Sequence, residues 1–502
     1  MKHGFSTDTF IRLSQQPNAH RLPRWVRQGP SWLASFALHL VMLVVLGLWI
    51  IPVVALPEVM LQSLPALTEE ESLEELQPVE MQQLDDDMAA LSELVPDASA
   101  DAAPSEVELG PADLLEAEPA SLTLDNFSEQ TALKDDLLTE VGGGQSSALS
   151  GRTSTNRRQS VKQYGGTARS EAVVAMALKW LADHQNPDGS WSFDHRSGPC
   201  NGRCRNPGSF SGARNGATAI ALLPFLGAGI THKEGKYKQN VEDGLYYLLR
   251  SMNVARDRGS FHDQGNMYSH GLATIALCEA YAMTQDRGLR DPAQHAINFI
   301  QFAQDPYGGG WRYTVKQKGD TSVVGWQIMA LKSGYMGYLI IDPKVITNSI
   351  RFLDSVQTER GAAYGYQSPG ESITTTAIGL LCRMYLGWEM DHPALEQGVQ
   401  YLAGKGPSQT NLYYDYYATQ VLFHFTEGQG PMWQQWNNKL REYLIGTQLT
   451  QDHEKGSWFV SDPHVLSGGR LYCTAMSTMI LEVYYRHMPI YQAEATKSDF
   501  PE

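Results

Sequence analysis

An acidic residue among phenol side chains is the strongest candidate for chemistry in this sequence. Asp415 lies in the run Tyr413-Tyr414-Asp415-Tyr416-Tyr417, and His270 precedes another apolar run. A positioned carboxylic acid can protonate an alkene, and aromatic ring faces stabilise the carbocation that results. We therefore predict Asp415 and His270 as the catalytic residues of any enzyme formed by this chain.

Other polar and aromatic residues stand near the beginnings of long apolar runs, where loops and helix N-termini would meet. We predict these as substrate-binding residues: Tyr268, Asp320, Trp326, Glu371, Tyr414, Tyr416 and Tyr472. A structural alternative exists for several of them. Asp320 precedes Thr321, and Glu371 precedes Ser372, as expected of helix N-caps and first-turn acids. The tyrosines are equally compatible with core and rim packing.

Two of the five cysteines differ from the rest in their surroundings. Cys200 and Cys204 lie in a loop rich in Gly, Pro and Asn, whereas the others fall in apolar runs and are expected in the core: Cys278, Cys382 and Cys473. For Cys200 and Cys204 we predict a disulfide, with two free thiols as the next alternative. A metal site with His195 is a third alternative, but no fourth ligand is evident. The prediction is therefore no metal and no cofactor.

A repeating unit predicts where these residues lie. Four times, a helix-like run ends in Gln and is followed by a Gly and an aromatic residue: Gln185/Gly189/Trp191, Gln304/Gly310/Trp311, Gln357/Gly361/Tyr364 and Gln448/Gly456/Trp458. Weaker copies occur near Met252 and in residues 403–407. Each copy precedes a second run that is apolar nearly all round. The pattern predicts six helical hairpins with the second helices buried inside the first, in a closed double ring. The Gln is expected to satisfy amide groups of the next helix.

The run from Ala177 to Gln185, followed by Asp188-Gly189-Ser190-Trp191, resembles the QW repeat of squalene-hopene cyclases and protein prenyltransferase subunits. The resemblance covers about residues 165–490 and implies an all-α, (α/α)6 toroid. It does not extend to the chemistry of these families. The toroid lacks the Asp-x-Asp-Asp acid motif of the cyclases, and Asp85-Asp86-Asp87 lies outside it. The Asp-x-Cys pair that holds zinc in prenyltransferases is also missing.

The N-terminal third predicts a membrane anchor and a spacer. Residues 32–56 carry no formal charge and are long enough to span a bilayer, and basic residues precede them. Residues 58–140 carry 23 acidic side chains and one lysine, a composition typical of disorder. We expect a cytoplasmic tail (1–31), a transmembrane helix (32–56), a disordered acidic spacer (57–165), an extracytoplasmic toroid (166–490) and a C-terminal tail (491–502).

Two functions follow as hypotheses. The first is a binding or interaction module that keeps the ring of the cyclases without their chemistry, with an envelope protein or an apolar lipid as ligand. The second is an isoprenoid or polycyclic-lipid cyclase or transferase with a non-standard active site. The enzyme requires an apolar cavity of several hundred Å³ at the inner-helix mouth, whereas the module predicts a shallow or side-chain-filled centre and a groove on one face. A third possibility, a polysaccharide lyase or hydrolase on a similar double ring, requires paired carboxylates or a Tyr/His/Arg set across a cleft. The short basic segment at residues 150–169 is too poor in aromatic residues to indicate nucleic acid.

Overall fold

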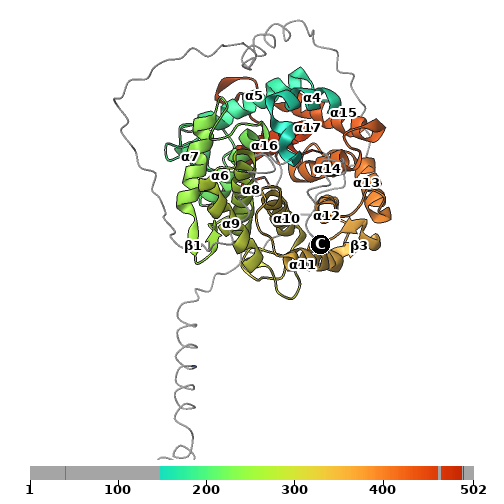
Figure 1. The fold of residues 1–502 in the computed structure, drawn as a ribbon. Coiled ribbons are helices and arrows are strands. Elements are labelled where there is room, and N and C mark those ends of the chain that lie inside the picture. Colours follow the sequence, from blue (N-terminus) through green and yellow to red (C-terminus); the bar gives the residue numbers. More distant parts are fainter. Residues whose placement is uncertain (1–39, 41–146, 462–464, 489, 491–502) are drawn as a thin grey trace, which may run out of the picture. The chain divides into compact units, whose positions relative to one another are not determined.

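The computed structural model describes Leu40, residues 147–461, residues 465–488 and residue 490 (Figure 1). Of the two units into which the chain divides, the second, Glu80–Glu502, contains every described residue except Leu40. Apart from Leu40, the predicted membrane span lies outside the described residues, as do the predicted tails and most of the spacer. Among the residues that are described, no helix combines the length and apolar character needed to cross a bilayer.

Six helical hairpins make up most of the second unit, as the repeat predicts. Each consists of an outer helix and the inner helix that follows it: α5 Ala168–Asp183 and α6 Arg214–Gly227; α7 Lys238–Ser251 and α8 Asn266–Thr284; α9 Arg287–Ala303 and α10 Thr321–Met336; α11 Pro343–Val356 and α12 Ile373–Tyr385; α13 Pro393–Lys405 and α14 Leu412–Phe425; α15 Gly430–Thr447 and α16 Gly469–Leu481. Two short antiparallel ladders accompany them, β1 Asn253–Ala255 with β2 Arg258–Ser260 and β3 Gln357–Thr358 with β4 Ala363–Tyr364.

The inner helices form a closed ring. Consecutive inner helices contact one another from α6 to α16, and α16 contacts α6. Their sequences explain this position, because α8, for example, buries residues on every side of the helix. The outer helices bury only one stripe, such as Leu289, Ala293, Ile297 and Ile300 of α9, spaced three or four residues apart. The twelve helices therefore form the two concentric layers of a toroid (Figure 1).

In three of the four predicted copies, the glutamine that ends an outer helix joins it to the next outer helix, whereas Gln357 accepts from Arg383 of α12. Gln185 Nε2 donates to Gly189 O at 2.8 Å and to Asn240 O of α7 at 2.9 Å. Gln304 does the same with Gly309 O and with Val345 O of α11. The prediction that the glutamine satisfies amide groups of the next helix is met by side-chain amides: Gln185 Oε1 accepts from Asn240 Nδ2 of α7 at 2.6 Å, and Gln304 Oε1 accepts from Asn348 Nδ2 of α11 at 3.1 Å. The donations from Nε2 to carbonyl groups were not predicted.

The repeat tryptophan and glycine complete the joint. The indole N–H of Trp191 donates to Leu181 O at 2.7 Å, a carbonyl in the last turn of α5, and the Trp191 backbone N–H donates to Thr218 Oγ1 of α6 at 3.0 Å. Gly189 has a φ of +85°, and a Cβ there would lie 2.3 Å from Asp243 O of α7. Glycine is thus required both by its conformation and by the close approach of the next helix.

The ring is closed by the same interaction between the last hairpin and the first. Gln448 Nε2 donates to Val173 O of α5 at 2.9 Å, across 275 positions of sequence, and to Gly456 O at 3.0 Å. The Trp458 indole N–H caps Leu444 O of α15 at 2.8 Å. No chain connection joins α15 and α16 to α5, so closure rests on non-covalent contacts, which include the bond from Gln448 to Val173 O and the packing of α16 on α5 and α6.

The predicted spacer ends earlier than expected. Residues expected to belong to it form η2 Ser147–Arg152 and α4 Ser154–Tyr164, and both pack against α17 Val483–Arg486. Arg152 is almost fully buried, and its Nη1 lies 2.8 Å from Glu279 Oε2 of α8. The composition of this basic segment indicates a linker, but a buried ion pair holds it in the fold. The sequence of the segment alone does not predict that ion pair.

Replacing Gln448 with Ala should destabilise the toroid by about 1–3 kcal/mol, because two buried carbonyl groups lose their donor. The free energy of unfolding from urea titration measures the effect. Gln400→Ala is the matched control, since Gln400 is exposed and donates only to Glu396 within its own helix. Equal stability of the two variants would show that the closing amide does not hold the ring.

Candidate functional site

The mouth formed by the N-terminal ends of the inner helices is filled with aromatic rings. Trp326 of α10 stacks on Tyr416 of α14, with ring centroids 5.7 Å apart and an interplanar angle of 18°. Tyr417 meets the edge of Trp326 at 5.7 Å, and Tyr413 lies 5.2 Å from Tyr417 in the same edge-to-face manner. Trp326, Tyr416 and Tyr417 are all buried. The predicted site residues Trp326 and Tyr416 therefore meet, but they pack against each other.

A chain of hydroxyl groups covers this aromatic cluster. Tyr268 OH donates to Ser322 Oγ at 2.8 Å, and Ser322 Oγ is 2.8 Å from Tyr413 OH. At the rim, Tyr313 OH and Tyr366 OH are 3.0 Å apart, and the ring of Tyr313 lies 6.2 Å from that of Tyr268. Burial is the main cause that raises the pKa of Tyr268 above its usual value. Tyr268 is therefore a neutral hydrogen-bonding group at the mouth.

Asp415 does not lie among these rings. Its Oδ1 accepts a hydrogen bond from the Ser408 backbone N–H at 2.7 Å, and its Oδ2 has no hydrogen-bond partner among the described residues. Burial raises the pKa of Asp415 well above its ordinary value, only partly offset by the Ser408 N–H and by Lys439. Asp415 follows Tyr414, whose ring packs on Trp436 of the outer helix α15. Both residues face the outer layer.

His270 has a structural position between two hairpins. Its Nδ1 accepts from the Phe261 backbone N–H at 3.2 Å, which leaves the Nε2 hydrogen to be donated to Ala296 O of α9 at 3.2 Å. Burial lowers the pKa of His270 to about 3, so the ring is neutral. Asp415 and His270 thus have separate partners on α14 and α8, and the structure does not join them as a catalytic pair.

The remaining predicted residues differ in burial and in structural role. Asp320 is the N-cap of α10, accepts from the Val323 N–H at 2.9 Å and lies 3.6 Å from Arg312 Nε, in agreement with the capping alternative. Glu371 is exposed two residues before α12 begins. Tyr472 of α16 is half-buried and close enough to Tyr413 to influence its pKa. Of the predicted set, Tyr268, Trp326, Tyr416 and Tyr472 belong to the filled mouth.

The opposite end of the ring is filled by charges. Glu279 Oε2 of α8 lies 2.8 Å from Arg152 Nη1 and 3.2 Å from Arg486 Nη2, and all three side chains are buried. Cavities of about 20 Å³ and about 10 Å³ lie beside this network, lined by residues that include Tyr385 and His487 in one and Tyr416 and Arg486 in the other. Each has room for roughly one water molecule. Neither can hold an isoprenoid.

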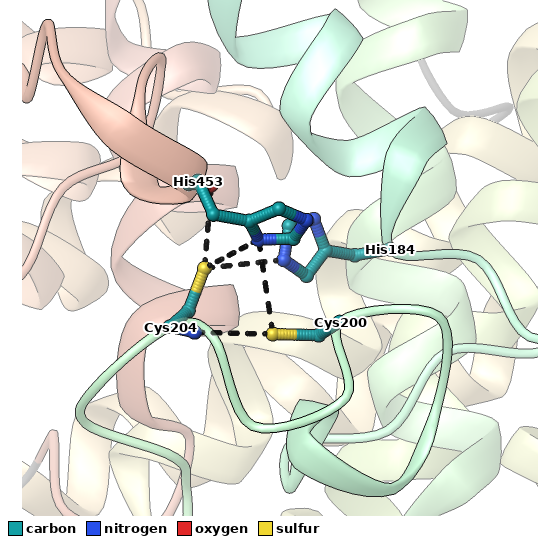
Figure 2. Close-up of side chains that lie close together, drawn as sticks. All are labelled: His184, Cys200, Cys204 and His453. Atoms are coloured by element: carbon teal, nitrogen blue, oxygen red, sulfur yellow. Dashed lines mark hydrogen bonds between the residues drawn. The ribbon is translucent and has the colours of Figure 1, made fainter.

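A second cluster of reactive side chains lies outside the ring centre (Figure 2). His184 is the C-cap residue of α5, Cys200 and Cys204 are in the loop before α6, and His453 is in η5 Asp452–Glu454 between α15 and α16. Cys204 Sγ lies 3.3 Å from His184 Nε2 and 3.1 Å from His453 Nδ1, and Cys200 Sγ lies 3.9 Å from His453 Nδ1. One nitrogen or sulfur atom from each residue lies within 4.8 Å of all the others.

The surroundings of this cluster fix its geometry. His184 Nδ1 lies 2.7 Å from Trp180 O, so Nδ1 carries the ring hydrogen and Nε2 has a free lone pair directed at Cys204. Glu454, next to His453, pairs with Arg205 at 2.9 Å and Arg470 at 3.0 Å. Burial lowers the pKa of His184 to about 3 and raises the pKa of Cys204 to about 12, with Cys200 adding to the second change.

Sequence reasoning found only half of this cluster. Both cysteines are free thiols in the structure, which is the second alternative and not the predicted disulfide. His195, the histidine considered with them, is not one of the four residues and meets the His184 ring edge-on at 5.8 Å. His184 follows α5 directly and could have been considered from proximity, whereas His453 is 249 positions from Cys204. Only ring closure brings it there.

No protein-family model matches the sequence, and no curated protein matches it. Solved structures with a similar fold include the type II terpene cyclase MstE from Scytonema, with 14% identity, coverage of 63% of this chain and 97% of the other, and a TM-score of 0.44. The α-1,6-mannanase of Salegentibacter sp. HEL1_6 has 10% identity, coverage of 63% and 98%, and a TM-score of 0.44. An α-amylase from Clostridium perfringens has 9% identity, coverage of 62% and 97%, and a TM-score of 0.42. The toroid itself is evident from the closed ring of inner helices.

Asp415→Asn should gain stability relative to the natural chain as the pH rises. A carboxyl group whose pKa is raised by folding stabilises the fold below its unfolded pKa and loses that contribution as pH rises towards the folded pKa. The amide has no such loss, so the advantage of the variant should grow by about 1.4 kcal/mol for each pH unit between the unfolded and the folded pKa of the carboxyl group. The free energy of unfolding, compared at about pH 4 and about pH 8, measures this advantage.

Asp391→Asn, at an exposed position, serves as the control and should show no such trend. A constant difference in stability between Asp415→Asn and the natural chain at both pH values would contradict the burial of a neutral carboxyl group.

Proposed function

We propose that this chain is a membrane-anchored interaction module whose toroid lies outside the cytoplasm and binds its partner on the toroid surface. The observation that supports this proposal is the filled mouth. Trp326, Tyr416 and Tyr417 are buried against one another where a cyclase would need an open apolar cavity. The alternative, an isoprenoid cyclase or transferase, would need these rings to separate before any substrate could enter.

The anchor and the orientation come from the sequence. Residues 32–56 have the length and apolar character of a single span, and the basic residues before it place the N-terminus in the cytoplasm by the positive-inside rule. The acidic stretch that follows would keep the toroid at a distance from the membrane. A tethered domain of this kind suits the recognition of another envelope protein.

The rim of the mouth is the surface that we assign to the partner. Tyr313 and Tyr366 are 36% and 39% exposed, and their hydroxyl groups are hydrogen-bonded to each other. Backbone hydrogen bonds from Met267 to Tyr313 O and from Thr321 to Tyr366 O fix both loops on the inner helices. Tyrosines held in this way offer large contact areas with little loss of side-chain entropy. They favour contact with a protein surface.

Isoprenoids should not stabilise the purified chain. Squalene and geranylgeranyl diphosphate, added in detergent, should leave the thermal midpoint unchanged. The cavities beside the buried charges measure about 20 Å³ and about 10 Å³, and the pocket of about 420 Å³ at the start of α6 is lined mainly by polar side chains that include Asn186, Asp188, Asp194 and Arg214. A ligand present at a hundred times its Kd would add about 2.7 kcal/mol to the free energy of unfolding. Detergent alone is the control. A reproducible rise in the midpoint, or conversion of either lipid, would overturn the proposal.

A photoreactive amino acid at position 366 should crosslink the chain to a protein in intact cells, because Tyr366 lies on the proposed contact surface. The same amino acid in place of Tyr246, which is 52% exposed on the outer helix α7, is the matched control. Adducts are detected by a change of mobility on denaturing gels and identified by mass spectrometry. Identical adducts at both positions, or none at 366, would count against recognition by the rim.

A further inference from the structure

We propose that His184, Cys200, Cys204 and His453 bind one Zn²⁺ ion that fastens the first hairpin of the ring to the sixth. The four side chains point towards a common centre from α5, from the loop before α6, and from η5 (Figure 2). Two thiolates and two imidazoles form one of the usual ligand sets of structural zinc. None of the four ligands is among the residues of the aromatic mouth or of the proposed contact surface.

The distances fit a tetrahedral ion. Zinc bonds of about 2.3 Å to sulfur and about 2.0–2.1 Å to nitrogen place neighbouring ligand atoms about 3.3–3.8 Å apart. The separations from sulfur to nitrogen are 3.1 Å, 3.3 Å and 3.9 Å, and no pair of ligand atoms exceeds 4.8 Å. The atoms therefore surround a volume of the size that one such ion occupies.

The single thiol hydrogen of Cys204 cannot serve all of its neighbours. Cys204 Sγ lies within 3.3 Å of His184 Nε2, His453 Nδ1 and His453 O, and it can donate to only one acceptor. The His184 ring hydrogen is already on Nδ1, towards Trp180 O, so His184 Nε2 is an acceptor. The lone pairs of His184 Nε2 and His453 O thus compete for one hydrogen. A cation bound by the sulfur and the two imidazoles would remove the need for that hydrogen.

The residues around the four ligands would support a metal. The contact from His184 Nδ1 to Trp180 O orients the imidazole, as outer partners do for metal-bound histidines. The Cys204 backbone N–H donates to Cys200 Sγ at 3.3 Å, which favours a thiolate. His184, Cys200 and Cys204 are buried, and His453 completes a four-ligand set with no position left for substrate. Four protein ligands indicate a structural role and not a catalytic one.

The location of the proposed ion indicates a role in ring closure. His184, Cys200 and Cys204 belong to the first hairpin and His453 to the sixth, so the ion would cross-link residues 249 positions apart. The cross-link lies where no chain connection joins neighbouring hairpins. Binding to the folded ring and not to the unfolded chain would stabilise the closed state directly.

The test is the zinc content of the full chain, purified from zinc-supplemented cells without chelators. Elemental analysis should give one zinc per chain. Cys204→Ser and His453→Ala should each lower the content at least about tenfold, because three ligands hold the ion far less tightly. Cys382→Ala and His262→Ala, a buried cysteine and an exposed histidine outside the cluster, should leave it unchanged.

Cobalt gives a second readout that does not depend on the stability of the variants. The natural chain, stripped of metal and supplied with Co²⁺, should develop the thiolate-to-cobalt charge-transfer band and the intense visible bands of a tetrahedral site. The stripped chain should also have a lower thermal midpoint, restored by Zn²⁺ but not by Mg²⁺. A folded natural chain that holds no zinc and gives no cobalt spectrum would overturn the proposal. A Cys200–Cys204 disulfide found in the native chain by mass spectrometry would overturn it as well.

Discussion

A buried glutamine amide closes this fold. Five of the six joints in the ring lie between hairpins that follow one another in the chain, and only the joint from the sixth hairpin to the first lacks a connecting loop. Gln448 makes there the same pair of donations, to a loop carbonyl and to the next outer helix, that Gln185 and Gln304 make elsewhere. The closing joint thus uses the same interaction as the joints at Gln185 and Gln304. The inner helices, apolar on all sides, need that closure because an open ring would expose them to water.

The aromatic rings at the mouth of the toroid are packed against one another. Stabilisation of a carbocation requires aromatic faces that are open to the substrate. Here the face of Trp326 is covered by Tyr416, and the phenol hydroxyls of Tyr268 and Tyr413 are bonded through Ser322. The only acid of the tyrosine run points elsewhere, because Asp415 is bonded to the loop before α14. The aromatic residues at the mouth are thus part of the core of the toroid.

Most of the fold could be predicted from periodic patterns within single segments. Contacts between segments far apart in the sequence could not. Six hairpins, buried inner helices and the capping role of Asp320 follow from patterns within single segments. Helical phase could also have separated Asp415 from the tyrosines, since residues 413, 416 and 417 share a face that residue 415 does not. The meeting of His453 with Cys204 could not be predicted in this way, because it depends on a joint between segments 249 positions apart. The buried ion pair between Arg152 and Glu279 could not be predicted for the same reason.

Polar and charged contacts are concentrated around the joint between the first and last hairpins. Glu454 of the sixth hairpin pairs with Arg205 of the first and with Arg470, beside the His and Cys cluster. Arg152, before the first hairpin, and Arg486, after the sixth, meet on Glu279 of the second. The carbonyl group of Tyr164 accepts from the Trp433 indole, which ties α4 to α15. A joint without a connecting loop has to offset the loss of chain entropy by contacts alone. Charged, directional interactions at this joint also fix its register. A shift of one helical turn would leave buried charges unpaired. Purely apolar helices could shift along one another without that penalty.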